Sequence, residues 1–234
     1  MRASRGILGE ENEVSMAPSD RVARVLRSVL SLSLAPLAGA CGGIDTDGFE
    51  EITCNRDGTT PVLEGLQPAT PADYLELREV EGSLVREAHG TPCATATDPA
   101  ACEAAIAAAT TTQGFMVGQC VDFCPLSYLV VNSGDEVTVL DTAAAVRAWM
   151  APLETNQEAV LAVRLAGYTV TCRDPDRGGV KKGEDGYEVL ATKITSSCDP
   201  IETTLYVVSV DSSGESVKEL ESEVIESDSG ACIG

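Results

Sequence analysis

Nine cysteines constrain the fold of this 234-residue chain more than any other feature. Eight of them lie in the long C-terminal part: Cys54, Cys93, Cys102, Cys120, Cys124, Cys172, Cys198 and Cys232. An even set can pair completely in an oxidising compartment. Only 4% of the residues are aromatic, so the core must come mainly from smaller aliphatic side chains. Since each native disulfide contributes about 2–4 kcal/mol, the sequence predicts a disulfide-stabilised fold.

Cys93 and Cys102 form the disulfide that the sequence favours first, because they lie eight residues apart across a predicted loop-to-helix corner. Cys120 and Cys124 are expected to take different partners. If residues 120–124 form a strand, the two α-carbons lie about 13 Å apart, whereas a disulfide needs less than about 7 Å. The remaining connectivity stays open, since eight cysteines allow on the order of 100 pairings.

The segment before the ninth cysteine, Cys41, has the three parts of a bacterial export signal. Three arginines at positions 21–27 form a basic region, residues 29–37 an apolar run, and Ala38-Gly39-Ala40 a small-residue exit. With a cysteine directly after this exit, the segment resembles a lipoprotein signal, in which that cysteine is acylated and becomes the new N-terminus. The number of cysteines supports lipidation of Cys41, since the other eight form an even set that can pair completely.

Secretion without a lipid is the alternative. Ala38-Gly39-Ala40 also fits an ordinary signal-peptide exit, and Leu37 lies one residue earlier than the aliphatic residue of a usual lipoprotein signal. The start is expected at Met16, because the acidic residues before it do not suit a basic region. The expected location is the outer membrane or cell surface, which Gly42 after the cysteine favours by analogy; free secretion or the periplasm is the alternative.

The predicted organisation has three parts: a signal peptide over residues 1–40, a tether over 41–71, and a single disulfide-rich domain over 72–234. Glycines after Cys41, and prolines at positions 61, 68 and 71, indicate the tether. No apolar run reaches the roughly 18–20 residues needed to cross a bilayer. Attachment to a membrane is therefore expected through the lipid.

Alternation and turn residues predict strands within the domain near 74–78, 84–86, 128–131, 136–140, 168–171, 187–194, 203–210 and 215–225. Helices are predicted over 98–109, 143–150 and 159–166, capped by Asp98, by Asp141-Thr142 and by a capping box at 155–158. Residues 173–186 are expected to form a polar loop. Hairpin-length connections favour an α+β fold, an antiparallel sheet with a few short helices on one face.

Charge limits the partners. From Cys41 onward the chain has 33 acidic and 11 basic residues, a formal net charge of −22 with the single histidine neutral. Such a surface repels phosphate backbones, so nucleic acid is excluded as a partner. The acids are scattered, which favours a solvated surface over a cation-binding one.

Motifs for catalysis, nucleotide binding or metal binding are absent from the sequence. His89 is the only histidine, and the pattern favours a structural or surface role over a general base beside a serine such as Ser83. The acids at 174–185 are mixed with basic residues, which favours a mobile solvated loop over calcium binding. Trp149 is expected in the core. No catalytic residue, metal ligand or cofactor is assigned.

Three segments carry a further resemblance: residues 93–102, residues 128–140 and Glu221–Glu226. On these segments the domain is similar to secreted lipoproteins of unknown function from predatory-type, high-GC bacteria. That group implies no activity and no catalytic residues. The expected partners are the membrane, through the lipid, and an envelope or extracellular protein. Oligomeric state is left open.

The sequence therefore favours a non-enzymatic binding module of the cell envelope, of which an inhibitor of secreted enzymes is one form. The alternative is an envelope hydrolase that uses His89 or a pair of carboxylates. Such a pair would lie about 5–10 Å apart, as in glycosidases.

Intact mass spectrometry of the membrane-fraction protein tests the anchor and the disulfides together. We expect an N-terminus at acylated Cys41, with eight alkylatable thiols that appear only after reduction. An unmodified Cys41, or a thiol that is free before reduction, would contradict the parity argument.

Overall fold

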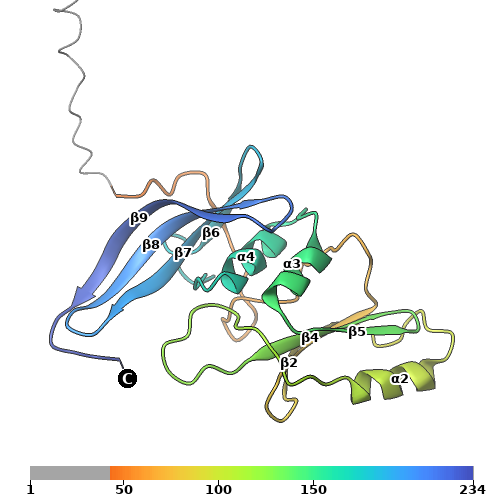
Figure 1. The fold of residues 1–234 in the computed structure, drawn as a ribbon. Coiled ribbons are helices and arrows are strands. Elements are labelled where there is room, and N and C mark those ends of the chain that lie inside the picture. The colour runs from red at the N-terminus through yellow and green to blue at the C-terminus, as the bar shows by residue number, and fades with distance from the viewer. Residues whose placement is uncertain (1–42, 234) are drawn as a thin grey trace, which may run out of the picture. The chain divides into compact units, whose positions relative to one another are not determined.

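Strands dominate residues 43–233, the part of the chain that the computed structural model describes (Figure 1). They form two antiparallel sheets. The four-stranded sheet has the order β3-β2-β4-β5, with β2 at Tyr74–Glu79, β3 at Val85–Gly90, β4 at Ser127–Ser133 and β5 at Glu136–Leu140. The predicted signal peptide and Cys41 lie outside the described residues.

The second sheet is five-stranded, with the order β1-β6-β7-β8-β9. Its strands are β1 at Glu50–Glu51, β6 at Gly179–Lys182, β7 at Gly186–Ser197, β8 at Ile201–Asp211 and β9 at Val217–Asp228. The long β7, β8 and β9 follow one another through short turns. Because β9 pairs only with β8, most of its residues are exposed.

Three short helices complete the described fold: α2 at Pro99–Ala108, α3 at Ala143–Met150 and α4 at Asn156–Leu165. Each helix begins directly after the residue that caps it. The side chains of Asp98, Thr142 and Thr155 each accept a hydrogen bond from the backbone N–H three residues later. Thr155 and Glu158 form a complete capping box. None of the helices in residues 43–233 is long and apolar enough to cross a membrane.

The α+β class and its stabilisation by disulfides are confirmed, and the strands divide between two sheets. Leu75 and Leu77 of β2 belong to the main core together with α3 and α4. Side chains alternate along a strand, so Glu76 and Arg78 point to the opposite face, where Arg78 contacts the end of α2. The four-stranded sheet therefore has helices on both faces.

Residues 43–71, expected to form a tether, are instead part of the folded body. Glu50 and Glu51 pair with β6, and the side chain of Leu63 is fully buried. The prolines prevent regular structure, but carboxylates far along the chain accept the backbone N–H groups. Glu87 accepts from Val62 and Leu63, which lets an irregular segment be buried without unpaired N–H groups.

The eight cysteines pair as Cys54–Cys172, Cys93–Cys102, Cys120–Cys124 and Cys198–Cys232. The pair favoured first from the sequence, Cys93–Cys102, is thus present. The expectation that Cys120 and Cys124 take different partners is wrong. Residues 120–124 form a bent loop rather than a strand, which brings the two α-carbons to 5.6 Å.

Two other expectations in the second half differ from the structure. The predicted loop 173–186 contains β6, which pairs with β7 and with β1. The predicted strand 168–171 is reduced to a single bridge, Thr169 with Thr192. Trp149 is partly buried and packs against the core.

Glu158 gives the first test of the packing of residues 43–71. Its fully buried carboxylate accepts hydrogen bonds from the backbone N–H groups of Gln67, Glu154 and Thr155. Glu158→Ala leaves these donors without a partner, each at about 1–3 kcal/mol. We expect a loss of about 3 kcal/mol or more in the free energy of unfolding, measured by denaturant titration. Glu154→Ala, which truncates a neighbouring exposed side chain, should stay within about 0.5 kcal/mol; equal losses would refute the argument.

Candidate functional site: an apolar surface around Phe123

Exposed apolar side chains gather at one place in the described chain. The exposed large hydrophobic residues are Leu84, Val85, Met116, Val121, Phe123, Leu126, Leu220 and Val224. Four of the eight come from residues 116–126, which we call the Phe123 loop, and two from the start of β3. Scattered exposed residues need no explanation, but a contiguous group marks an interaction site.

The end of β2 joins the two segments. The backbone N–H of Glu79 donates to the carbonyl of Leu84, and that of Val80 donates to the carbonyl of Leu126. Leu84 and Leu126 therefore flank one extended segment, about 10 Å apart at the usual strand spacing of about 4.8 Å. The start of β3 and the Phe123 loop thus belong to one surface.

The base of the Phe123 loop is fixed to three elements. Phe115 and Ser127 exchange backbone hydrogen bonds of 2.8 Å, which close the loop at the start of β4. The N–H of Gly118 donates to the carbonyl of Arg164 at the end of α4, at 2.9 Å. The side-chain amide of Gln119 bonds to both backbone groups of Ile194 on β7, at 2.8 and 2.6 Å.

Gln119 acts as a substitute strand partner. β6 pairs with only the first part of β7, so Ile194 has a free edge on that side. The amide of Gln119 supplies one donor and one acceptor to this edge, as a neighbouring strand does. The loop is thereby held against the five-stranded sheet as well as the four-stranded one.

Close packing explains the glycine before the loop. A Cβ on Gly114 would lie 2.6 Å from a methyl group of Val80 and 2.8 Å from the Cβ of Leu126. Only a residue without a side chain allows the chain to cross the end of β2 this closely.

The tip of the Phe123 loop projects beyond this fixed base. Cys120–Cys124 closes a ring of five residues, so only residues 121–123 lie between the linked positions. Phe123 is 77% exposed. A large aromatic ring that is mostly exposed to water on a constrained loop points to a contact with another molecule.

A groove of about 630 Å³ lies beside the Phe123 loop. It shares Met116 and Leu126 with the loop, and its other walls come from the start of α3, the end of α4 and the turn between β8 and β9. Its charged lining residues are Arg147 and Glu215. The groove and the exposed surface thus adjoin at Met116 and Leu126, while Phe123 lies outside the groove.

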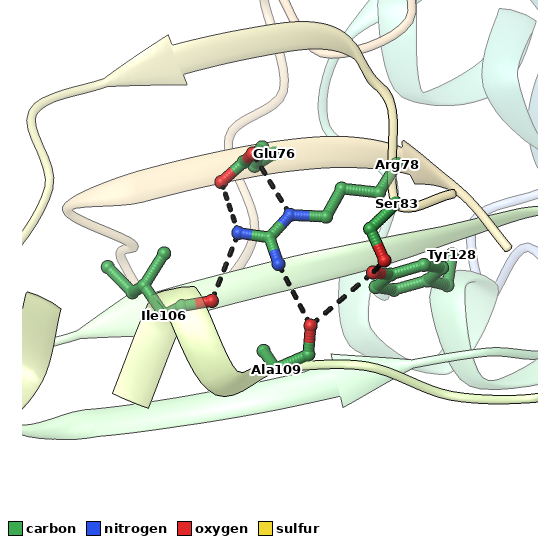
Figure 2. Close-up of polar contacts among 6 residues, drawn as sticks. All are labelled: Glu76, Arg78, Ser83, Ile106, Ala109 and Tyr128. Carbon is green, nitrogen blue, oxygen red and sulfur yellow. Dashed lines mark hydrogen bonds and ion pairs between the residues drawn. The ribbon is translucent and has the colours of Figure 1, made fainter. Parts of the chain in front are cut away.

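A buried polar cluster lies on the face of the four-stranded sheet that contacts α2 (Figure 2). The Arg78 guanidinium makes two bonds to the Glu76 carboxylate, of 3.0 and 2.9 Å. It also donates to the carbonyls of Ile106 and Ala109, at 3.0 and 2.8 Å. These carbonyls end α2, where unpaired acceptors and the helix dipole favour a cation.

Tyr128 extends the cluster toward the surface. Its hydroxyl donates to the Ser83 hydroxyl or to the carbonyl of Ala109, each at 3.4 Å. Ser83 precedes Leu84, and Tyr128 follows the Phe123 loop by two residues. The hydrogen bonds to Glu76 raise the pKa of the Arg78 guanidinium, which therefore stays charged.

The structure does not bring His89 and Ser83 together. His89 lies exposed on β3, opposite Leu75. Ser83 lies in the turn before the other end of β3, six positions from His89, which corresponds to about 20 Å of strand. The separation exceeds hydrogen-bond reach, so this pairing gives no support to a hydrolase.

The acidic residues of the 174–185 region serve local contacts. Arg177 bridges Asp174 at 3.2 Å and Glu226 on β9 at 2.7 Å. Within the described residues, no group of three or more His, Cys, Asp or Glu side chains is placed to share a metal ion.

Comparison of the chain with protein-family models, with curated proteins and with solved structures gives no match. The geometry of the candidate site is therefore the basis for inferring function.

Sequence reasoning did not identify the Phe123 loop. The spacing Cys120-x-x-x-Cys124, with an aromatic residue and a proline beside the second cysteine, is the signal that was present in the sequence. Because strand geometry was assumed for residues 120–124, the short disulfide ring between Cys120 and Cys124 was not predicted. The residues that hold the base, Arg164 and Ile194, are too distant in sequence for a local pattern to reveal.

The buried pair predicts a contrast between two arginines. Arg78→Met leaves Glu76 buried without a partner, at about 3–5 kcal/mol of unfolding free energy. Arg86→Met removes an ion pair with Glu79 whose arginine is half exposed, at about 0–1 kcal/mol. Denaturant unfolding of both variants measures the difference. The double variant Glu76→Met with Arg78→Met should recover at least half of the loss; similar losses for Arg78→Met and Arg86→Met would contradict a stabilising role for the cluster.

Proposed function

We propose that this protein is a non-enzymatic binding module of the cell envelope, lipid-anchored at Cys41, that contacts a partner protein through the Phe123 loop. The observation that carries the proposal is the exposed Phe123 ring on a loop whose base is fixed to β4, α4 and β7.

Rigidity at the base favours binding. Ordering a mobile loop on association costs free energy, and a loop that is already held in place avoids most of this cost. The backbone bonds of Phe115 and Gly118, the side chain of Gln119 and the short disulfide ring act on the same stretch. The Phe123 loop therefore resembles a preorganised contact element.

Charge favours a basic partner. The net charge of −22 over the chain from Cys41 opposes association with anionic surfaces and with further copies of the same chain. Asp122 lies between the exposed Val121 and Phe123. A pocket for an aromatic ring with a cation at its rim has the complementary chemistry.

Photo-crosslinking in the native host tests the contact. Phe123 is replaced by the photoreactive residue p-benzoylphenylalanine in the full-length chain. We expect a light-dependent adduct with another envelope protein. The matched control carries the same residue at Leu220, which is 53% exposed on β9, and should give no such adduct.

Competition with purified protein then measures how much Phe123 contributes. Aromatic residues at the centre of an interface cost about 2 kcal/mol or more when truncated, so Phe123→Ser should compete at least about 30-fold less well than the unsubstituted protein. Leu220→Ser should compete fully. Equal competition by Phe123→Ser, or the same adducts from both positions, would refute the proposal.

A further inference from the structure

The groove beside the Phe123 loop contains a cation among apolar walls. Its apolar side chains include Phe115, Met116, Leu126, Leu165 and Val217. Arg147 lines the same groove from α3, one helical turn after Ala143, which also lines it. An apolar cavity with one or two placed polar groups is the usual form of a small-molecule site, and about 630 Å³ lies within the usual range of about 300–1,000 Å³.

Arg147 differs from the other arginines near this part of the fold. Arg78 and Arg86 each contact a carboxylate, and Arg164 donates to the carbonyls of Thr60 and Pro61. Arg147 takes part in none of the ion pairs found within residues 43–233, and its side chain is half-buried. A guanidinium with available donors suits a carboxylate, which it can bind with two parallel hydrogen bonds.

We propose that this groove binds a monocarboxylate with an apolar tail, a fatty acid, whose carboxylate pairs with Arg147. The tail replaces water along Phe115, Met116, Leu165 and Val217, and burial of apolar surface supplies most of the affinity. The charge on Arg147 selects the acid over a neutral lipid.

Glu215 provides a second charge in the groove whose effect on binding can be tested. This exposed carboxylate lines the groove from the turn between β8 and β9 and repels a bound anion. The acids elsewhere in the chain are screened beyond about 8 Å at physiological salt. Arg147 and Glu215 are thus expected to change the affinity in opposite directions, which simple adsorption on an apolar surface does not do.

The inference is separate from the proposed partner contact, because Phe123 does not line the groove. Phe123→Ser should leave fatty-acid binding unchanged. A failure of one proposal is therefore distinguishable from a failure of the other.

Calorimetric titration of the purified chain with laurate, below its micelle concentration, tests the site. Trp149, the only tryptophan, lies two residues from Arg147 on α3 and gives a second readout by fluorescence. We expect saturable binding of one laurate per chain. Arg147→Gln should weaken laurate binding at least about tenfold, because a hydrogen bond to a charged group usually contributes that much. Glu215→Gln should strengthen laurate binding. Methyl laurate, which lacks the charge, should bind the chain and its Arg147→Gln variant equally.

Equal laurate affinity for the unsubstituted chain and a folded Arg147→Gln variant would overturn the proposal, as would the absence of saturable binding. A peptide ending in leucine that binds more tightly than laurate would overturn the assignment to a fatty acid. Arg147→Lys keeps the charge but not the paired geometry, so its affinity for laurate should lie between those of the unsubstituted chain and Arg147→Gln.

Discussion

The buried carboxylate of Glu158 joins parts of the chain that no regular hydrogen-bond ladder connects. It accepts from Thr155 and Glu154 at the start of α4 and from Gln67, 91 residues earlier. A buried carboxylate is costly unless its oxygens are hydrogen-bonded, and three N–H donors meet that requirement here. Because α4 packs on β6, β7 and β8, this group ties the irregular chain at Gln67 to the five-stranded sheet, in addition to the pairing of β1 with β6 and the Cys54–Cys172 disulfide.

Carboxylates also accept backbone N–H groups at other irregular segments. Glu87 accepts the N–H groups of Val62 and Leu63, and Asp73 accepts from Thr95 and Gly134. The hydrogen bonds from Thr95 and Gly134 lower the pKa of Asp73. Its contribution to stability is thus present above the unfolded-state pKa and is lost as the pH falls through the lower folded-state value. Part of the acidic excess therefore has a structural role in addition to keeping the surface solvated.

Local signals in the sequence predicted the elements that depend on neighbouring residues. The caps at Asp98, Thr142 and Thr155 and the hairpin of β4 and β5 needed only side chains within four positions, so they could be predicted. The short β1 could not, because its partner β6 lies in a distant part of the chain. β6 pairs with the neighbouring β7, but its charged and glycine-rich surroundings favoured a loop. Distance in sequence also hid the folding of residues 43–71, because the carboxylates that accept the N–H groups of Leu63 and Gln67 lie 24 and 91 residues away.

The candidate site escaped prediction for a related reason, and that reason bears on its role. The Phe123 loop has no helix or strand of its own, and its position comes from Arg164, Ile194 and Ser127, which belong to three different elements. Such anchoring is unnecessary for a linker, since loops are tolerated on a surface without it. Fixed geometry at the base has value when the tip must present a side chain in one orientation. Here the tip presents Phe123, and the groove that Arg147 lines shares Phe115 and Met116 with the same stretch of backbone. Both proposed contacts thus depend on how residues 115–126 are anchored.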